Sequence, residues 1–218
     1  MSAVSTPAAA VATAEEVIPE GFEEVYANIL YFAREEFGFE GFGGECGLAA
    51  MLLNKYVFQG QGTLVAAVNK ALWKNGAGSL VGHVAIRWRG SYWDVDGEPK
   101  DLEDVESWGM LDPEDRDWIK AARKAGVTWD EVAAEEVVLV ELTETEIMQR
   151  FKLLTKSGVS KVRGQEVALF EGIAELGDYR FFPPPKHPVT GRQAMDPWSL
   201  VVASAPAPAE PDDDDPSP

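Results

Sequence analysis

Residues of the kind that perform nucleophilic catalysis occur close together in the first half of the chain. Cys46 is the only cysteine, and it lies where a glycine-rich loop meets an apolar run. Because the Ala, Leu and Met content of that run favours a helix, Cys46 is predicted at a helix N-terminus. Free N–H groups and the positive end of the helix dipole stabilise a thiolate there. The same N–H groups could hold the oxyanion of a tetrahedral intermediate, so Cys46 is the candidate nucleophile.

Partners for a catalytic thiol follow about 40 residues later. His83 starts a β-branched and aromatic run, and its imidazole could take the thiol proton and later return it to a leaving group. Asp94 and Asp96 lie in the next run, and either could accept a hydrogen bond from the other ring nitrogen of His83 and fix its tautomer. The second histidine, His187, lies in a proline-rich segment that is typical of a loop. These residues predict a Cys–His–Asp triad whose acid is Asp94 or Asp96.

A predicted β-hairpin over residues 82–96 would bring the histidine and the acids together. Two β-branched and aromatic runs flank Arg89-Gly90, which is typical of a two-residue hairpin turn. That turn places Asp94 and Asp96 on the same side of the hairpin as His83. The opposite side consists of apolar residues, namely Val84, Ile86, Trp88, Trp93 and Val95. The alternation therefore supports a site on the His83 side and does not choose between the two aspartates.

Helices are predicted before this hairpin. Apolar residues at helical spacing predict an amphipathic helix over residues 21–37, and the run that begins at Cys46 predicts a mostly buried one. Thr63 is a plausible N-cap for a third helix. Its inner face would consist of Leu64, Val65, Val68, Ala71 and Leu72.

Mixed elements are predicted after the hairpin. Asp112-Pro113 is typical of a helix start and predicts a helix that ends near Ala125, and residues 137–140 fit a short strand. Thr143 and Glu146 match a capping box, which predicts a helix that continues to about Leu154. Residues 167–176 are ambiguous between strand and helix. Helices first, then a hairpin and mixed elements, indicate an α+β fold.

The charge of the chain is uneven. It has 37 acidic and 19 basic residues, a net charge of −18, and residues 94–146 alone carry 18 acids against 5 bases. Such a field repels phosphate backbones, so we expect no nucleic-acid partner. Residues 1–18 are predicted to be a disordered leader, and residues 201–218 a disordered acidic tail. Residues 19–200 would then form a single domain that includes the acidic segment 94–146.

Composition also limits where the protein works. A lone cysteine cannot form an internal disulfide, and no apolar run approaches the roughly 18 residues that span a bilayer. The N-terminus has no Lys or Arg before an apolar stretch, which argues against a secretory signal. These features predict a soluble, cytoplasmic protein with no membrane partner.

The motifs around the candidate triad resemble the papain-like cysteine hydrolase superfamily. The order of Cys, His and Asp is similar to its compact branches, the transglutaminase-like and arylamine N-acetyltransferase-like folds. GGEC at 43–46 looks like the Gly-Gly-x-Cys before the acetyltransferase nucleophile. GHVAIRWRGSYWDVDG at 82–97 is similar to a segment of small bacterial and phage cysteine hydrolases, an alignment in which the triad acid is Asp94 and Gly97 closes the segment. The resemblance covers residues 43–97, about a quarter of the chain.

This resemblance implies a fold and an activity. The fold would be papain/transglutaminase-like, with N-terminal helices, one of them bearing the nucleophile, packed on a small antiparallel sheet. The papain type has an oxyanion Gln before its nucleophile, but this chain has Glu40 and Glu45 there, so only backbone N–H donors are expected. The activity would be that of a thiol hydrolase (peptidase or amidase) or acyltransferase on an amide, isopeptide or ester bond. It proceeds through an acyl-enzyme and needs no metal or organic cofactor.

The sequence leaves the partner and the class of protein open. An enzyme would bind a peptide or protein substrate, and a cationic one if the acids of residues 94–146 line the cleft beside Cys46. The alternative is a non-enzymatic acidic interaction or inhibitor protein that mimics a polyanion and docks on a basic partner. A third hypothesis combines the two: the triad residues are kept without their catalytic activity, and the protein serves as a scaffold.

Overall fold

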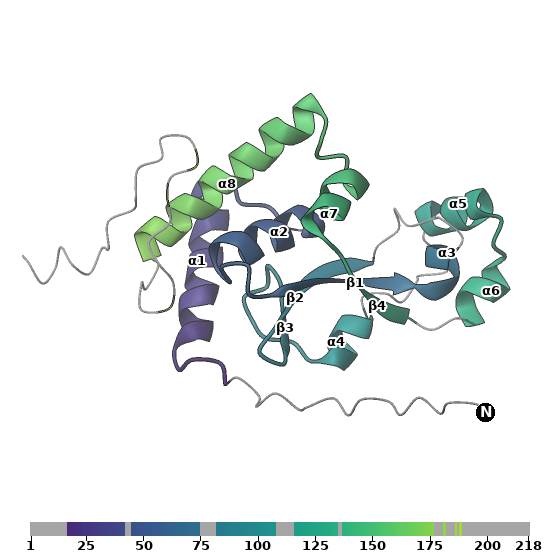
Figure 1. Ribbon diagram of the computed structural model, residues 1–218, viewed down its shortest axis with the longest axis horizontal. Helices are drawn as coiled ribbons and strands as arrows, with labels where there is room; N and C mark the ends of the chain where they lie inside the picture. The colour runs from purple at the N-terminus through teal and green to yellow at the C-terminus, as the bar shows by residue number, and fades with distance from the viewer. Residues whose placement is uncertain are drawn as a thin grey trace, which may run out of the picture.

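The computed structural model describes residues 17–41, 45–74, 82–107, 116–134 and 137–176, together with positions 181, 186 and 188. This described part is a mixed α+β structure with a four-stranded antiparallel sheet, which confirms the α+β part of the predicted fold (Figure 1). The helices are α1 (Phe22–Phe37), α2 (Cys46–Tyr56), α3 (Lys70–Lys74), α4 (Leu102–Ser107), α5 (Arg116–Ala125), α6 (Trp129–Ala134), α7 (Glu144–Arg150) and α8 (Lys156–Leu176). The strands are β1 (Thr63–Asn69), β2 (His83–Trp88), β3 (Ser91–Trp93) and β4 (Val137–Glu141).

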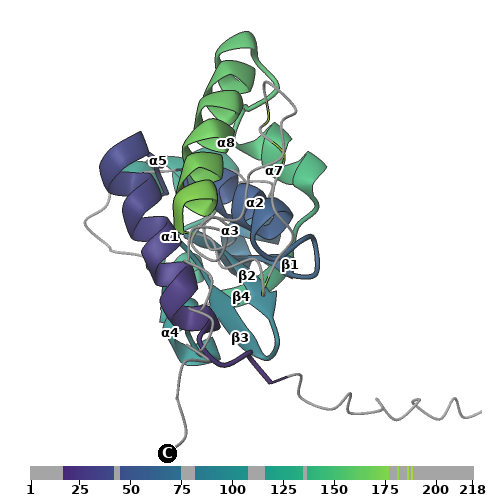
Figure 2. The ribbon, with the colours of Figure 1, turned by 90° about the vertical axis from the view of Figure 1, so that its left-hand side faces the viewer.

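The sheet has the order β3-β2-β1-β4, and the helices cover it unequally. Figure 1 shows α2, α7 and α8 on one side of the sheet and α4 on the other, with α1 at one end and α3, α5 and α6 at the opposite end. Figure 2 shows α1 and α8 side by side. Their close approach requires Gly172, because a Cβ there would lie 2.7 Å from the Cβ of Ala33. Helix α2, which begins at Cys46, packs between α8 and strand β2.

The predicted third helix is wrong over most of its length. Thr63–Asn69 is the strand β1, and only Lys70–Lys74 is helical. Strand β1 is central, since it pairs with both β2 and β4, and it is buried from Leu64 to Asn69. A strand that is covered on both faces is apolar at every position, so it lacks the alternation that distinguishes a strand from a buried helix.

The predicted hairpin is confirmed. Arg89 and Gly90 have positive φ angles of 51° and 78°, as a two-residue type I′ turn requires. The ladder pairs Trp88 with Ser91 and ends at the pair of Ile86 with Trp93. Asp94 and the residues after it therefore lie beyond the strand pairing. The directions of their side chains are set by the local turn at Asp94–Asp96 and not by the alternation of a β-strand.

Most other predicted elements are confirmed, with different ends. The helix over residues 21–37 and the helix that starts at Cys46 are α1 and α2. The capping box is present, with both reciprocal hydrogen bonds, although α7 ends at Arg150 instead of continuing to Leu154. The ambiguous residues 167–176 are helical and form the second half of α8.

Several sequence predictions fall outside the described residues. These are nearly all of the leader, the whole acidic tail, His187 and the start of the helix at Asp112, of which Arg116–Ala125 is described as α5. Among the helices that the structure describes, none combines the length and the apolar character needed to cross a membrane.

An aromatic cluster fixes the hairpin against α1. Trp88 and Trp93 project from the two hairpin strands and pack against Phe22, Tyr26 and Phe58, with ring centroids 4.8–6.0 Å apart. Trp93 and Tyr26 are fully buried. Packed aromatic rings hold their backbones rigidly, so α1 and the hairpin form a firm support for the residues at the hairpin ends.

Candidate active site

Cys46 is partly exposed at the first position of α2. The preceding residue, Glu45, makes no side-chain cap on the helix and instead pairs with Lys161 of α8, with an Nζ to Oε1 distance of 2.5 Å. The first intrahelical hydrogen bond runs from the N–H of Ala49 to the carbonyl of Glu45. The N–H groups of Cys46, Gly47 and Leu48 therefore precede the first helical hydrogen bond and have no acceptor within the helix itself.

His83 lies between a thiol and a carboxylate. Its Nε2 is 3.0 Å from Oδ2 of Asp94, and its side chain also hydrogen-bonds to Cys46. Both groups of the His–Asp pair are largely buried, with 15% and 4% of their side chains exposed. Because Nε2 faces Asp94, Nδ1 is the ring nitrogen available to exchange a proton with the Cys46 thiol. The structure thus brings together three of the four residues that the sequence singled out.

Asp96 is the residue that the structure does not bring into this group. Its carboxylate is 43% exposed and pairs with Nζ of Lys100 at 3.0 Å. Its backbone N–H instead donates to Oδ1 of Asp94, at 2.9 Å. This turn within the Asp94–Asp96 segment occupies one carboxylate oxygen of Asp94 and leaves the other for His83.

The surroundings of His83 favour its charged form. Burial lowers the pKa of His83, but the hydrogen bond to Asp94, followed by the hydrogen bond and charge of Cys46, outweighs it. The net result raises the pKa from 6.5 to about 9. His83 is therefore an imidazolium near neutral pH, in hydrogen-bonding contact with Cys46.

This raised pKa predicts a pH-dependent stability. Protonation of His83 stabilises the folded state fully below pH 6.5, and this stabilisation is lost as the pH rises through about 9. We expect the free energy of unfolding in urea to fall by on the order of 3 kcal/mol across that window, since one pKa unit corresponds to about 1.4 kcal/mol. His83→Gln should remove most of this fall. A native protein whose stability is flat from pH 6.5 to 9 would contradict the arrangement.

Tyr26 of α1 holds the backbone of the triad acid. Its hydroxyl donates to the carbonyl oxygen of Asp94 at 2.6 Å. Burial raises the pKa of Tyr26 well above 10, and the charges of Asp94 and Asp96 raise it further, so the phenol keeps the proton that it donates. Three residues after Asp94, Gly97 has a φ of +89°. It packs so closely on α1 that a Cβ at this position would lie 3.1 Å from the Cα of Ala27. Helix α1 therefore positions the whole Asp94 turn.

Tyr26→Phe should weaken the site without opening the aromatic cluster, because the ring stays and only the hydroxyl is lost. The buried carbonyl of Asp94 would lose its donor, which costs about 1–3 kcal/mol of unfolding free energy. Tyr31→Phe is the matched control, since Tyr31 lies on the same helix and is 69% exposed. Urea unfolding of the two variants should show the loss only for Tyr26. Equal stabilities would show that the hydroxyl does not hold the turn.

Gln165 of α8 and Phe151, which follows α7, also support the segment around the nucleophile, and sequence reasoning missed them. Gln165 is buried and clamps the segment before Cys46, since its Oε1 accepts from the N–H of Glu40 at 2.6 Å and its amide donates to the carbonyl of Gly38. Phe151 packs on Gly47 so tightly that a Cβ there would lie 2.3 Å from the ring. A buried amide on an otherwise apolar helix face is the one signal that could have indicated Gln165.

Within the described residues, no group of three or more His, Cys, Asp or Glu side chains is arranged to hold a metal ion. The candidate site offers the thiol of Cys46, the imidazole of His83 and the carboxylate of Asp94. No family model matches the chain, and no curated protein or solved structure shows significant similarity to it. The papain-like resemblance accordingly stays a prediction from the motifs.

Proposed function

We propose that the protein is a papain-like thiol hydrolase or acyltransferase that acts on an amide, isopeptide or ester bond. The observation that carries this proposal is the contact of His83 with both Cys46 and Asp94, at the N-terminus of one helix and the start of one strand. A nucleophile, a base in contact with it and a carboxylate that orients the base are the parts that acyl transfer requires.

In the acylation step, Cys46 is the nucleophile and His83 is the proton donor. The Cys46 sulfur attacks the carbonyl carbon and forms the S–C bond, while the carbonyl oxygen takes up the negative charge. Backbone N–H groups of the first turn of α2 are the donors available to this oxyanion. The His83 imidazolium then gives its proton to the leaving amine or alcohol as the bond to carbon breaks.

Deacylation reverses the roles. Neutral His83 takes a proton from water or from an amine, which attacks the thioester carbon as the S–C bond breaks. The sulfur leaves as thiolate beside the re-formed imidazolium. Asp94 keeps the ring oriented in both steps through its 3.0 Å contact with Nε2. Water as acceptor gives hydrolysis, and an amine gives acyl transfer.

The proposal is tested with p-nitrophenyl acetate, an activated ester that acylates thiols. We expect the native protein to release one equivalent of p-nitrophenolate in a burst and then to turn over more slowly. The burst should be at least about 100-fold faster than acylation of the same chain unfolded in urea, which is the contribution expected of a positioned acid–base group. A native protein with no burst, or with the rate of the unfolded chain, would overturn the proposal.

The alternative of a non-enzymatic acidic protein stays a sequence prediction. Acidic side chains of residues 94–107 that the structure describes, such as Glu98, Asp101 and Glu103, are exposed, as either function would allow. Asp94 is the exception, because it is buried against His83. A buried carboxylate costs stability unless it is paired, so its position favours the catalytic hypothesis over an acidic docking surface.

A further inference from the structure

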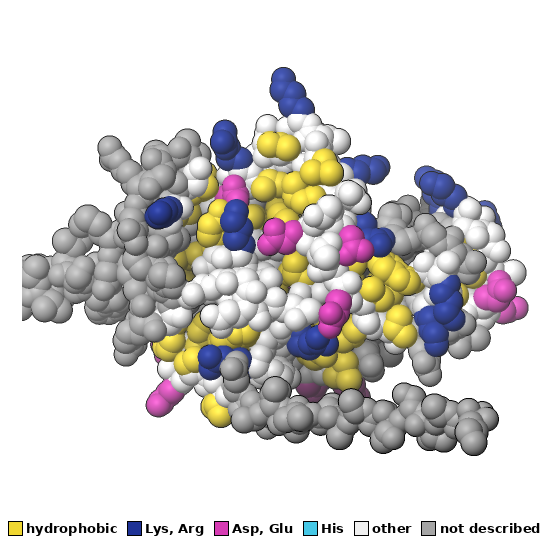
Figure 3. Space-filling model, viewed as in Figure 1, with side chains coloured by type: hydrophobic (Ala, Val, Ile, Leu, Met, Phe, Trp, Pro, Cys, Tyr) yellow, Lys and Arg dark blue, Asp and Glu magenta, His cyan; other side chains and the backbone are white. Residues whose placement is uncertain are grey.

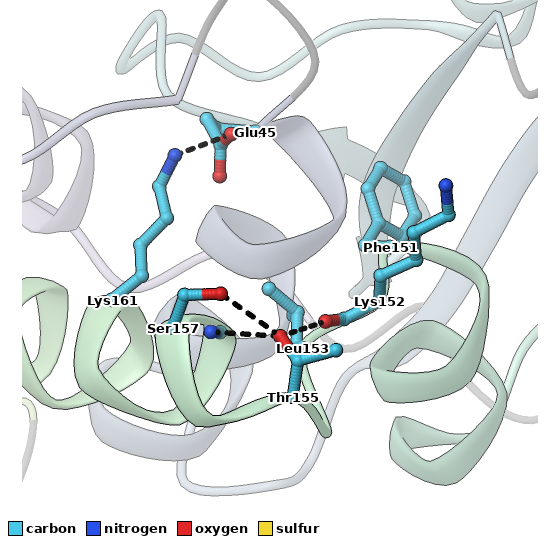
Figure 4. Close-up of a pocket in the computed structure, with 8 residues that line it drawn as sticks. Glu45, Phe151, Lys152, Leu153, Thr155, Ser157 and Lys161 are labelled. Atoms are coloured by element: carbon cyan, nitrogen blue, oxygen red, sulfur yellow. Dashed lines mark hydrogen bonds and ion pairs between the residues drawn. The ribbon is translucent and has the colours of Figure 1, made fainter.

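A pocket of about 390 Å³ lies between the start of α2 and the segment that joins α7 to α8. Figure 4 shows Lys161 reaching from α8 toward Glu45 on one side of the pocket, with Phe151 on the other. Thr155 and Ser157 lie between these walls. The full set of lining residues is Glu45, Phe151, Lys152, Leu153, Thr155, Ser157, Gly158 and Lys161.

The pocket borders the candidate nucleophile on both sides along the chain. Glu45, which lines it, immediately precedes Cys46. Phe151, which forms the opposite wall, packs directly on Gly47, the residue that follows Cys46. The pocket is therefore bordered by Glu45, which precedes Cys46, and by a ring that packs on Gly47, which follows it. A substrate whose scissile carbonyl is attacked by Cys46 would bring its neighbouring side chain toward this pocket.

The lining chemistry is apolar and slightly basic. Phe151, Leu153 and the aliphatic stems of two lysines provide the apolar walls. Its only carboxylate, Glu45, is paired with Lys161, so a substrate cation entering the pocket would meet an ammonium group. None of the described acidic residues of the segment 94–146 lines it.

The surface around the pocket continues this apolar character. Figure 3 shows hydrophobic side chains gathered over α7 and α8. Leu154 and Val159, which adjoin the lining residues Leu153 and Gly158 in the chain, are 61% and 55% exposed. An exposed apolar rim around an apolar pocket is typical of a binding site.

We propose that this pocket receives the substrate side chain next to the scissile bond, and that it selects a neutral apolar or aromatic side chain and rejects Lys and Arg. This inference rests on the proposed function, because it assigns the substrate class of the same site. The selective element is the Lys161–Glu45 ion pair. Lys161 pairs with Glu45, the one carboxylate that lines the pocket, and its stem adds to the apolar wall. Lys161 is a specificity-determining residue in this account.

The test measures how fast Cys46 is alkylated by N-chloroacetyl-Phe-amide and by N-chloroacetyl-Lys-amide, each relative to chloroacetamide. Because the chain has one cysteine, intact mass identifies the modified residue when Cys46→Ser is run beside it. We expect the Phe reagent to react at least about 10-fold faster than the Lys reagent, the discrimination that a fitting apolar pocket gives. Lys161→Met leaves Glu45 without this partner and should lower that ratio toward one.

Lys156→Met is the matched control, since Lys156 is exposed on the same helix and does not line the pocket. It should leave the ratio of the two rates unchanged. Equal rates for the Phe and Lys reagents, or the same ratio in Lys161→Met as in the native protein, would overturn the pocket assignment. Loss of the ester burst would instead overturn the proposed function, whatever the ratio, so the two failures are distinguishable.

Discussion

Replacing Cys46 by Ser, or His83 by Gln, should each lower the rate of the ester burst by at least about 1,000-fold. The first change removes the sulfur that forms the acyl bond. The second removes the imidazole that hydrogen-bonds to that sulfur and takes up its proton. The burst of p-nitrophenolate, followed by stopped flow near neutral pH, measures both effects.

The double variant distinguishes a catalytic unit from two independent contributions. Groups that act together show effects that are far from additive, so Cys46→Ser with His83→Gln should be no slower than either single variant. Circular dichroism should show all three variants folded, because Cys46 and His83 lie at the edge of the core rather than inside it. Additive losses, or a His83→Gln variant that keeps the native burst, would argue against a shared mechanism.

Asp94→Asn should slow the burst by at least about 100-fold and should also change its pH dependence. The carboxylate of Asp94 is the first of the groups that raise the pKa of His83 to about 9. Without this charge, the His83 pKa falls, and the imidazolium beside the Cys46 sulfur is lost at a lower pH. The high-pH limit of the burst should therefore move down from about 9 in this variant.

Asp96→Asn is the matched control for this prediction. Asp96 lies two residues away, carries the same charge and pairs with Lys100 at the surface. Its replacement should change the burst rate by less than about threefold, since exposed ion pairs contribute little. If the two variants lose the same activity, the loss reflects the general negative charge of the turn and not the contact between Asp94 and His83.

Local signals in the sequence sufficed for the elements that carry the site. The Arg89-Gly90 turn between aromatic and β-branched runs predicts the hairpin, and the structure has that turn with the expected register. The glycine loop before an Ala- and Leu-rich run predicts the helix start at Cys46. Each of these patterns depends only on residues that are neighbours in the chain, so it can be recognised without knowing the tertiary structure.

The remaining features depend on contacts between distant segments. Thr63–Asn69 looks helical because both its faces are buried, a fact that only its two neighbouring strands explain. The choice of Asp94 over Asp96 is made where strand pairing stops, by the hydroxyl of Tyr26 and the local turn. Likewise, the pocket needs α8 to bring Lys161 to Glu45, and nothing in either segment alone predicts that pairing.

The most direct test of a working Cys46–His83–Asp94 site is the intact mass of the protein during its first turnover with p-nitrophenyl acetate. We predict that the native protein gains one acetyl group at Cys46 during the burst and loses it as turnover continues. Cys46→Ser should gain none at this position on the same timescale. If the native chain gains the acetyl group no faster than the chain unfolded in urea, Cys46 is an ordinary thiol and the account is wrong.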